Sequence, residues 1–179
     1  MTVLYFFLIA YFVTIAFLIY GFSKIRHFDV IDVIPTTKFS IIVPFRNENE
    51  NLPQLLSSIS MLDYPTTLLE VILVDDGSDL KFKIPNYDFK ISMLENLRVS
   101  TSPKKDAILT AIQMISNEWI VTTDANCVVH PKWLLTLDSS IQNKKPEMIV
   151  GAVTYSKINS FLHYFSTIGF GKFAGNNNW

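Results

Sequence analysis

The distribution of apolar residues divides the chain into a continuous N-terminal run and a long region of alternating patterns. Residues 3–22, VLYFFLIAYFVTIAFLIYGF, contain no charged side chain, and about 20 apolar residues are enough to cross the hydrocarbon core of a bilayer as a helix. Tyr5 and Tyr20 lie near the two ends of this run, where membrane interfaces favour aromatic side chains. The pattern predicts a transmembrane anchor over residues 1–23.

A cleaved signal peptide and a buried core segment are the alternative interpretations of this run. A signal peptide would begin with a basic region, continue with a shorter apolar stretch and end at a small-residue cleavage site, which is not the pattern found here. Lys24, Arg26 and His27 follow the run directly. The positive-inside rule therefore predicts that the rest of the chain is cytoplasmic, attached to a plasma or inner membrane.

Residues 24–37 show no clear periodicity and are interpreted as a linker from the membrane to a domain. Beyond them, short apolar runs alternate with segments of helical spacing. The runs typical of strands cover residues 38–44, 69–76, 96–101, 118–124 and 148–155. Apolar residues at helical spacing form three stripes between these runs: Leu52, Leu55, Leu56, Ile59 and Leu62; Ile108, Ala111, Ile112 and Ile115; Leu134, Leu137 and Ile141.

Helix-start signals support two of these stripes. Ser102 and Pro103 precede the second stripe, and Pro131 precedes the third. Alternating β and α units of this size predict an α/β fold with a mainly parallel sheet flanked by helices. We expect this domain to cover residues 38–155. Residues 156–179 are apolar and aromatic but broken by glycines, and we interpret them as an interfacial segment or the start of an acceptor-side region that is cut short.

Composition removes several classes of function. Fifteen basic residues against sixteen acidic ones give a net charge of −1, so no broad attraction to nucleic acid is expected. Cys127 is the single cysteine, which excludes an intrachain disulfide and a cysteine-rich zinc site. His27, His130 and His163 are scattered, unlike the close spacing of metal-binding histidine pairs.

Polar residues gather where the predicted strands end. The first strand leads into PFRNENEN, the second into DDGSD, the third into SPKKD and the fourth into DANC. In open α/β sheets, ligands bind outside the carboxyl ends of the strands. Carboxylates and two lysines on one such edge suit a phosphorylated ligand with a divalent cation, and the lysines, Lys104 and Lys105, lie near a helix start that itself favours anions.

Each of these segments also has a purely structural interpretation. Asp-Gly after a strand is a common turn, paired lysines commonly form a solvated face, and Asp and Asn close loops by binding their own backbone. Cys127 fits a small apolar residue in the interior, and Trp119 and Trp133 fit core or helix anchors. The arrival of four such segments at one edge favours a binding site over four separate structural roles.

The segments SIIVPFRNENENLPQLLSSI, YPTTLLEVILVDDGSD, KKDAI and VTTDANCVVHPKWL resemble, in order and spacing, the donor-binding half of a family 2 glycosyltransferase of the GT-A fold. The resemblance covers about residues 38–155, and a leading membrane helix fits the membrane-bound members. It implies that Pro44, Arg46 and Glu48 border the nucleotide base. It also implies that Asp76, with Asp75 beside it, binds the uracil or the ribose.

The resemblance further implies a phosphate and cation side of the site. Lys105 would lie near the nucleotide and its phosphates, and Asp124 would lie by the ribose and a divalent metal, Mg²⁺ or Mn²⁺. The family's direct metal ligand would stand at position 126, where this chain has Asn126. An amide oxygen is a hard but uncharged ligand, so weak metal binding is expected.

The activity implied by the resemblance is transfer of a sugar, with inversion, from a nucleotide sugar, best matched by a UDP-sugar, to a hydroxyl of a glycan or lipid-linked acceptor. Neither the family's acceptor-side base nor the Gln-x-x-Arg-Trp element of processive members is found, since the only glutamines, Gln54, Gln113 and Gln142, begin no such motif. We interpret the chain as the N-terminal part of a longer enzyme.

Two other hypotheses remain at this point. One is a catalytically silent membrane module that binds a nucleotide sugar or acts as a scaffold. The other, a dinucleotide-binding domain, is disfavoured because no Gly-x-Gly-x-x-Gly follows the first strand.

Overall fold

The structure, a computed structural model, describes residues 2–24, 33–115, 117–151 and 153. Contacts between Cα atoms divide the chain into two units, residues 1–29 with 150–179, and residues 30–149.

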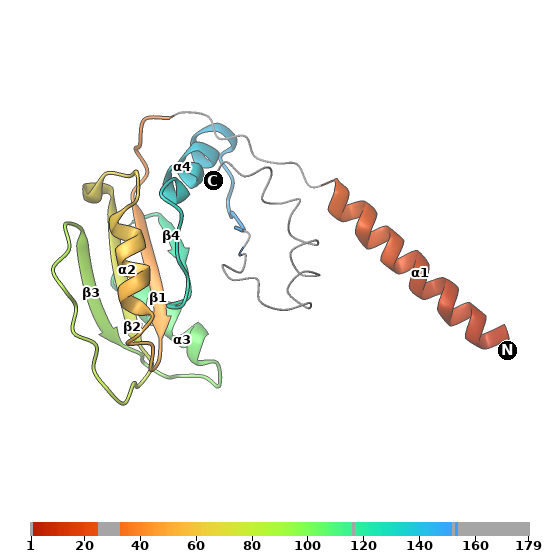
Figure 1. The fold of residues 1–179 in the computed structure, drawn as a ribbon, viewed down its shortest axis with the longest axis horizontal. Helices are drawn as coiled ribbons and strands as arrows, with labels where there is room; N and C mark the ends of the chain where they lie inside the picture. Colours follow the sequence, from red (N-terminus) through yellow and green to blue (C-terminus); the bar gives the residue numbers. More distant parts are fainter. Residues whose placement is uncertain (1, 25–32, 116, 152, 154–179) are drawn as a thin grey trace. The chain divides into compact units, whose positions relative to one another are not determined.

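The first unit contains the helix α1, Thr2–Ser23 (Figure 1). Its residues 2–21 are long and apolar enough to cross a membrane, a test that an N-terminal signal sequence passes as well. The helix is apolar on all sides, and its described side chains are exposed. A helix that is hydrophobic all round requires an apolar environment, which agrees with the apolar helix predicted from the sequence.

The second unit is built on a four-stranded parallel sheet. The strands are β1 (Phe39–Phe45), β2 (Leu69–Asp75), β3 (Lys90–Glu95) and β4 (Trp119–Thr122), in the spatial order β3-β2-β1-β4. Figure 1 shows the two central strands flanked by the two outer ones. The mainly parallel sheet predicted from the sequence is confirmed.

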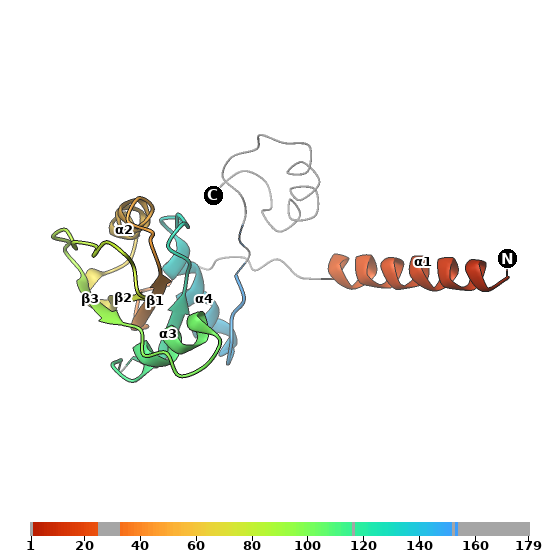
Figure 2. The ribbon, with the colours of Figure 1, turned by 90° about the horizontal axis from the view of Figure 1, so that it is seen from below.

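Helices cover both faces of the sheet. α2 (Leu52–Ser60) and α4 (Trp133–Lys144) pack on the face formed by Phe39, Ile41 and Val43. α3 (Pro103–Ile112) packs on the opposite face, against Ile42, Ile72 and Val74; Figure 2 shows α2 and α3 on opposite sides of the sheet. A short 3-10 helix, Thr66–Leu68, leads into β2.

This layered burial explains the sequence pattern. β1 and β2 are central and covered on both faces, so almost every residue in them is buried and the apolar run is continuous. The three stripes lie largely within α2, α3 and α4, but Leu62 and Ile115 follow the ends of α2 and α3, and Ile112 is exposed. Trp119 and Trp133 pack against the core from partly buried positions, as expected for anchors. Cys127 is only partly buried.

The third predicted strand was misplaced. The strand of this region is β3, Lys90–Glu95, and residues 96–101 form a loop. Two backbone N–H groups of that loop, those of Val99 and Ser100, donate to the Asp106 carboxylate rather than to a strand. The apolar side chains of Leu97 and Val99 are exposed. A side-chain acceptor has replaced the ladder bonds that a strand would need.

The predicted strand over residues 148–155 is also wrong for the part that the structure describes. Residues 148–151 and 153 form no strand, while residues 152, 154 and 155 lie outside the described residues. Met148, Val150 and Val153 are largely exposed, so burial does not stabilise an extended strand there. Residues 156–179 and most of the predicted linker, residues 25–32, also lie outside the described residues.

The chain just before β1 is held by a buried carboxylate. Asp138 on α4 is fully buried and accepts hydrogen bonds from Thr36 N at 3.0 Å, Tyr64 Oη at 2.8 Å and Gln142 Nε2 at 2.9 Å. Thr36 N and Tyr64 Oη donate to Asp138 Oδ2, whereas Gln142 Nε2 and the Thr37 hydroxyl donate to Oδ1. Burial acts to raise the pKa of Asp138, and the hydrogen bonds, led by that of Thr37, outweigh it and hold the pKa below its ordinary value. Residues 36–37 are thereby fixed to the domain.

Candidate nucleotide-binding site

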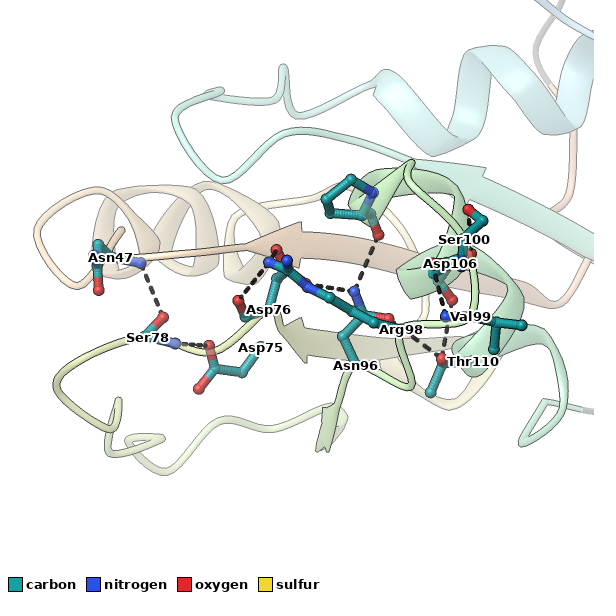
Figure 3. Close-up of polar contacts among 11 residues, drawn as sticks. Asn47, Asp75, Asp76, Ser78, Asn96, Arg98, Val99, Ser100, Asp106 and Thr110 are labelled. Atoms are coloured by element: carbon teal, nitrogen blue, oxygen red, sulfur yellow. Dashed lines mark hydrogen bonds and ion pairs between the residues drawn. The ribbon is translucent and has the colours of Figure 1, made fainter.

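The carboxyl ends of three strands lie side by side at one edge of the sheet. In the register of the parallel strands, Phe45 of β1 is paired with Asp75 of β2, and Asp75 with Glu95 of β3. The fourth strand, β4, ends at Thr122, which is paired with Ile42, three residues before the end of β1. The polar segments that follow these strands are therefore brought to one edge, as the sequence predicted. Figure 3 shows residues of the segments that follow β1, β2 and β3.

Pro44 lies within β1, beyond its last pair with β4. Phe45 O accepts a hydrogen bond from Asp76 N on the β2 side, so by the alternation of a parallel strand the backbone of Pro44 faces the β4 side. Because β4 has already ended there, the missing N–H of the proline leaves no ladder acceptor unpaired. The proline thus lies where β1 has lost its β4 neighbour and is paired with β2 alone, one residue before the strand ends.

The loops after β1 and β2 bind each other directly. Asn47 N donates to Ser78 Oγ at 2.9 Å, and the Asn47 amide exchanges two hydrogen bonds with Asp79, both at 2.9 Å. Asn47 has a left-handed backbone with φ 56°, a conformation that asparagine tolerates better than most residues. Asp75 Oδ1 accepts the Ser78 N–H at 2.8 Å and closes the turn. Asp75 is therefore a buried turn-forming carboxylate beside the edge rather than one pointing freely into it.

Asp76 carries the central charge of this edge. Arg98 Nε donates to Asp76 Oδ1 at 2.7 Å, the Arg98 Nη2 group pairs with Oδ2, and Asn96 Nδ2 donates to Oδ1 at 2.6 Å. The hydrogen bonds of Arg98 lower the pKa of Asp76, burial opposes the shift, and Asn96 and the charge of Arg46 reinforce it. The carboxylate is thus held ionised and fixed in direction, as Figure 3 shows.

Two other predicted residues lie on the loop after β1. Arg46 is exposed and close enough to Asp76 to lower its pKa by charge. Glu48 is half-buried, and its carboxylate accepts a hydrogen bond from Asn51 Nδ2 at 2.6 Å at the start of α2. The structure therefore places Arg46 with the Asp76 group and turns Glu48 toward α2.

The start of α3 lies between Asp76 and Asp124. The Asn96 amide that binds Asp76 also donates to Pro103 O at 3.0 Å. The next residue along the chain, Lys104, places its Nζ 2.5 Å from Asp124 Oδ1. Through these contacts the structure brings both predicted carboxylates to one helix N-terminus, where backbone N–H groups favour anions.

A buried carboxylate fixes this helix start. Asp106 accepts the N–H groups of Val99 at 2.9 Å and Ser100 at 2.7 Å, together with the Ser100 hydroxyl at 2.8 Å. The backbone N–H of Ser100 is the largest cause that lowers the pKa of Asp106, and burial opposes the shift. Thr110 adds a contact to Leu97 N at 3.2 Å. The loop 96–102 is therefore tied to the first turns of α3.

The turn that follows β4 is more open. Asp124 and Asn126 are both exposed, and Asp124 O accepts Cys127 N at 3.1 Å. Among the described residues, no group of three or more His, Cys, Asp and Glu side chains lies close enough to hold a metal ion. Asp124 and Asn126 nevertheless supply two hard oxygen atoms, the donor type that Mg²⁺ and Mn²⁺ accept alongside phosphate oxygens. The residues fit a cation shared with a bound diphosphate and do not form a complete protein cage.

Several residues of this edge were not predicted from the sequence. Arg98 and Asn96 were assigned to a strand, and Asn47 was not singled out. The signal available in the sequence was the alternation of polar and apolar residues in KISMLE, which is typical of an outer strand and would have placed the following NLR in a loop. Lys105, which was expected near the phosphates, is exposed on α3, and its neighbour Lys104 is the lysine that contacts Asp124.

A hollow of about 370 Å³ lies at the opposite edge of the sheet, where the strands begin. Its main carboxylate, Glu70, is already bound by Lys90 Nζ at 2.7 Å, Ser40 Oγ at 2.7 Å and Asn117 Nδ2 at 3.1 Å. These partners neutralise and satisfy Glu70, the carboxylate that lines this hollow. The carboxyl edge differs in presenting Asp76 and Asp124 beside a helix N-terminus.

Comparison with known proteins agrees with this arrangement. Residues 40–177 match the family model described as "Glycosyl transferase family 2". "Glycosyltransferase AglE" of Haloferax volcanii is 27% identical over 124 residues, which cover 67% of this chain and 40% of AglE. "Poly-beta-1,6-N-acetyl-D-glucosamine synthase" of Staphylococcus epidermidis is 28% identical over 146 residues, which cover 76% of this chain and 33% of that protein.

A solved structure shows the same fold. Residues 1–349 of Staphylococcus aureus TarS, in complex with UDP-GlcNAc, superpose with a TM-score of 0.50 at 23% identity, covering 61% of this chain and 32% of that one. The chain thus spans two fifths or less of the length of these relatives. Because the family model covers more than three quarters of the chain, the chain belongs to glycosyl transferase family 2.

Proposed function

We propose that this chain is the donor-binding part of a membrane-anchored glycosyltransferase that uses a nucleoside diphosphate sugar. The observation that carries the proposal is the meeting of Asp76, with its partner Arg98, and Asp124, with its partner Lys104, at the N-terminus of α3. Such a ligand requires acidic groups that bind its ribose or a divalent metal ion. It also requires basic side chains beside a helix N-terminus, which bind its diphosphate.

The solved structures of similar proteins support this class of ligand but differ in its nucleobase. TarS has been solved with UDP-GlcNAc, and a mannosyltransferase of Pyrobaculum calidifontis, which has a TM-score of 0.50 at 22% identity and covers 69% of this chain and 38% of that one, has been solved with GDP-Man and Mn²⁺. The ligands share a nucleoside diphosphate joined to a sugar. For this chain we propose a UDP-sugar.

We assign the ligand's nucleoside to the edge formed by the loops after β1 and β2. Pro44, Arg46 and Glu48 border the base in this proposal, and Asp76, supported by the turn that Asp75 closes, binds the uracil or ribose. The hydrogen bonds that Asn47 forms with Ser78 and Asp79 support this assignment, because they hold the two loops together before a ligand binds and so reduce the conformational entropy lost on binding.

We assign the diphosphate to the start of α3, near Lys105, and a divalent metal to Asp124 and Asn126. The metal, when bound, would stabilise the charge on the departing diphosphate. With one carboxylate and one amide from the chain, the phosphate oxygens would supply most of the negative charge around it.

The proposed reaction is an inverting displacement. The oxygen of an acceptor hydroxyl, on a glycan or a lipid-linked sugar, bonds to the anomeric carbon as the bond from that carbon to the diphosphate breaks. The hydroxyl proton passes to a carboxylate base, which we place outside residues 38–155, in an acceptor-side region that residues 156–179 would begin. The nucleoside diphosphate leaves toward α3.

The membrane attachment is supported by α1 and by the charges that follow it. Lys24 Nζ lies 5.2 Å from the centre of the Tyr20 ring at the end of the helix, an aromatic and basic pair typical of a membrane interface. We propose α1 as the anchor, residues 24–37 as the connection, and residues 38–155 as a cytoplasmic domain.

One observation favours a second function. The uncharged Asn126 at the metal position is compatible with a catalytically silent module that binds a nucleotide sugar without transferring it. Both functions require nucleotide binding, so the first test is calorimetry of the full chain in detergent micelles with UDP, GDP and UMP in the presence of Mg²⁺. We expect UDP to bind more tightly than UMP, because the diphosphate contacts α3, and more tightly than GDP. Binding of none of them would contradict both functions.

Release of free sugar from the bound donor then separates the two functions. A donor-binding part of a transferase orients the diphosphate as a leaving group, so slow hydrolysis of the matching UDP-sugar is expected. Binding of the intact UDP-sugar with no hydrolysis above buffer would favour the silent module.

A further inference from the structure

Lys104 and Asp124 form an ion pair between two segments that meet only in the folded domain. Lys104 lies in the first turn of α3 and Asp124 in the turn after β4, and Lys104 Nζ is 2.5 Å from Asp124 Oδ1. The backbone of Lys104 is fixed by the contact of Asn96 with Pro103 O and by the bonds that Asp106 forms with residues 99 and 100. The ammonium group of Lys104 is therefore held within contact distance of the Asp124 carboxylate.

The charges of the turn mean that this ion pair affects cation binding. Asp124 is the acidic residue of the DANC turn, and Asn126 is neutral. With Lys104 in place, the formal charge of the pair is zero. A divalent cation at Asp124 would need the same carboxylate and would be repelled by the ammonium group, so Lys104 and the cation compete for one ligand.

We propose that Lys104 is an internal counterion of Asp124 that gives way to a divalent cation and then pairs with the donor's diphosphate. In the nucleotide-free protein Lys104 occupies the carboxylate and disfavours the metal. When a diphosphate arrives, it offers the ammonium group a new anionic partner next to the helix N-terminus, and Asp124 becomes available to the cation. The exchange makes metal and diphosphate binding mutually dependent; its second half rests on the proposed function.

The pair is exposed, which limits the size of the effect. The side chains of Lys104 and Asp124 are 61% and 56% exposed, so solvent screens their attraction. Removing the ammonium group should therefore raise metal affinity by roughly three- to tenfold, the range expected for one exposed charge a few ångströms from a divalent ion.

The first experiment measures Mn²⁺ binding without nucleotide by electron paramagnetic resonance on the full chain in detergent micelles. Asn126→Asp serves as the background because a second carboxylate brings the affinity into a measurable range. Adding Lys104→Met should raise Mn²⁺ affinity by roughly three- to tenfold. The matched control is Lys38→Met, which removes a lysine at the opposite edge of the sheet and should leave Mn²⁺ affinity unchanged. Adding Asp124→Asn to the Lys104→Met protein should abolish the gain in Mn²⁺ affinity.

Two results would overturn the counterion role. One is an unchanged Mn²⁺ affinity in the Lys104→Met protein that retains a wild-type thermal unfolding curve. The other is an equal gain from Lys105→Met, because that would show a general effect of charge on α3 rather than competition at Asp124. Neither result depends on whether the protein binds a nucleotide.

The second experiment tests the diphosphate half by calorimetry in EDTA. Lys104→Met should weaken UDP binding by about five- to thirtyfold and UMP binding less than twofold, since UMP lacks the second phosphate. An equal loss for UDP and UMP, or no loss, would overturn this half. If the wild-type chain binds neither nucleotide while the Mn²⁺ result holds, the proposed function has failed and the counterion role of Lys104 stands.

Discussion

Arg98 forms a bidentate ion pair with Asp76, although the two residues follow different strands of the sheet. Its Nε and Nη2 groups donate to the two carboxylate oxygens, and Asn96 adds a third donor at 2.6 Å. The Asp76 side chain is only 11% exposed, whereas that of Arg98 is 46% exposed. Asp76 is therefore held in one orientation by a partner that remains accessible to a ligand.

Replacing Asp76→Ala should weaken UDP binding by about 1.5–3 kcal/mol, the usual range for hydrogen bonds to a charged group. Calorimetry measures the loss, and Asp88→Ala, which removes an exposed carboxylate before β3, is the matched control. Equal UDP affinity in a folded Asp76→Ala protein would reject the assignment of Asp76 to the nucleoside.

The Asp124 turn yields a prediction about metal binding. Asn126→Asp supplies a charged ligand in place of a neutral one at nearly constant size, so Mn²⁺ affinity should rise in the presence of UDP, because the number of charged ligands sets the affinity for a divalent cation. Asp124→Ala should abolish the metal dependence of UDP binding. The measurement is Mn²⁺ titration by electron paramagnetic resonance with and without UDP. If Asn126→Asp leaves Mn²⁺ affinity unchanged while UDP still binds, the turn has only a structural role.

Asp138 should make the stability of the domain sensitive to acid. Its pKa in the folded protein is lowered because the hydrogen bonds to its carboxylate outweigh the effect of burial. A lowered folded pKa means that the unfolded chain binds the proton first, so the stabilisation is present above about pH 4, the unfolded value, and is lost as the pH falls through the folded pKa.

At pH 7 the free energy of unfolding of the variant Asp138→Asn should therefore be lower than that of the wild type by about 2–4 kcal/mol. Between pH 5 and pH 3 the variant should lose less further stability than the wild type does. Urea unfolding across that range is the measurement, and Asp88→Asn is the control for an exposed carboxylate. A parallel pH dependence of wild type and Asp138→Asn would contradict the role of this group.

The anchor predicts a topology. With α1 across the membrane and Lys24, Arg26 and His27 on its cytoplasmic side, a tag placed after Trp179 should resist protease added to intact cells and be digested once the cells are permeabilised. Digestion of the tag in intact cells would reverse the assigned orientation.

The sequence predicted those parts of the fold whose cause is local burial. β1 and β2 are continuous apolar runs because both of their faces are covered, and α2 shows its buried stripe directly. β3 was missed because it is an outer strand in which Lys90, Ser92 and Glu95 are exposed. The neighbouring loop residues Leu97 and Val99 looked more strand-like although they are exposed.

The site was predicted to the level of segments and not of individual partners. The four polar segments were expected at one edge because parallel strands place their carboxyl ends together. Lys104 and Lys105 could not be distinguished, because adjacent residues on a helix point about 100° apart and their direction depends on how α3 is seated. The role of Arg98 could not be predicted either, because its pairing with Asp76 depends on the conformation of the loop that Asp106 fixes.

The most direct test of nucleotide binding at the carboxyl edge is hydrogen exchange of the full chain in detergent micelles, with and without UDP and Mg²⁺, followed by mass spectrometry. Nucleotide binding at this edge should slow exchange in peptides covering residues 44–48, 75–79, 96–106 and 123–127, and should leave residues 66–69 and 84–90 at the opposite edge unchanged. Slower exchange confined to the opposite edge, or no change at the carboxyl edge when calorimetry shows that UDP is bound, would contradict it.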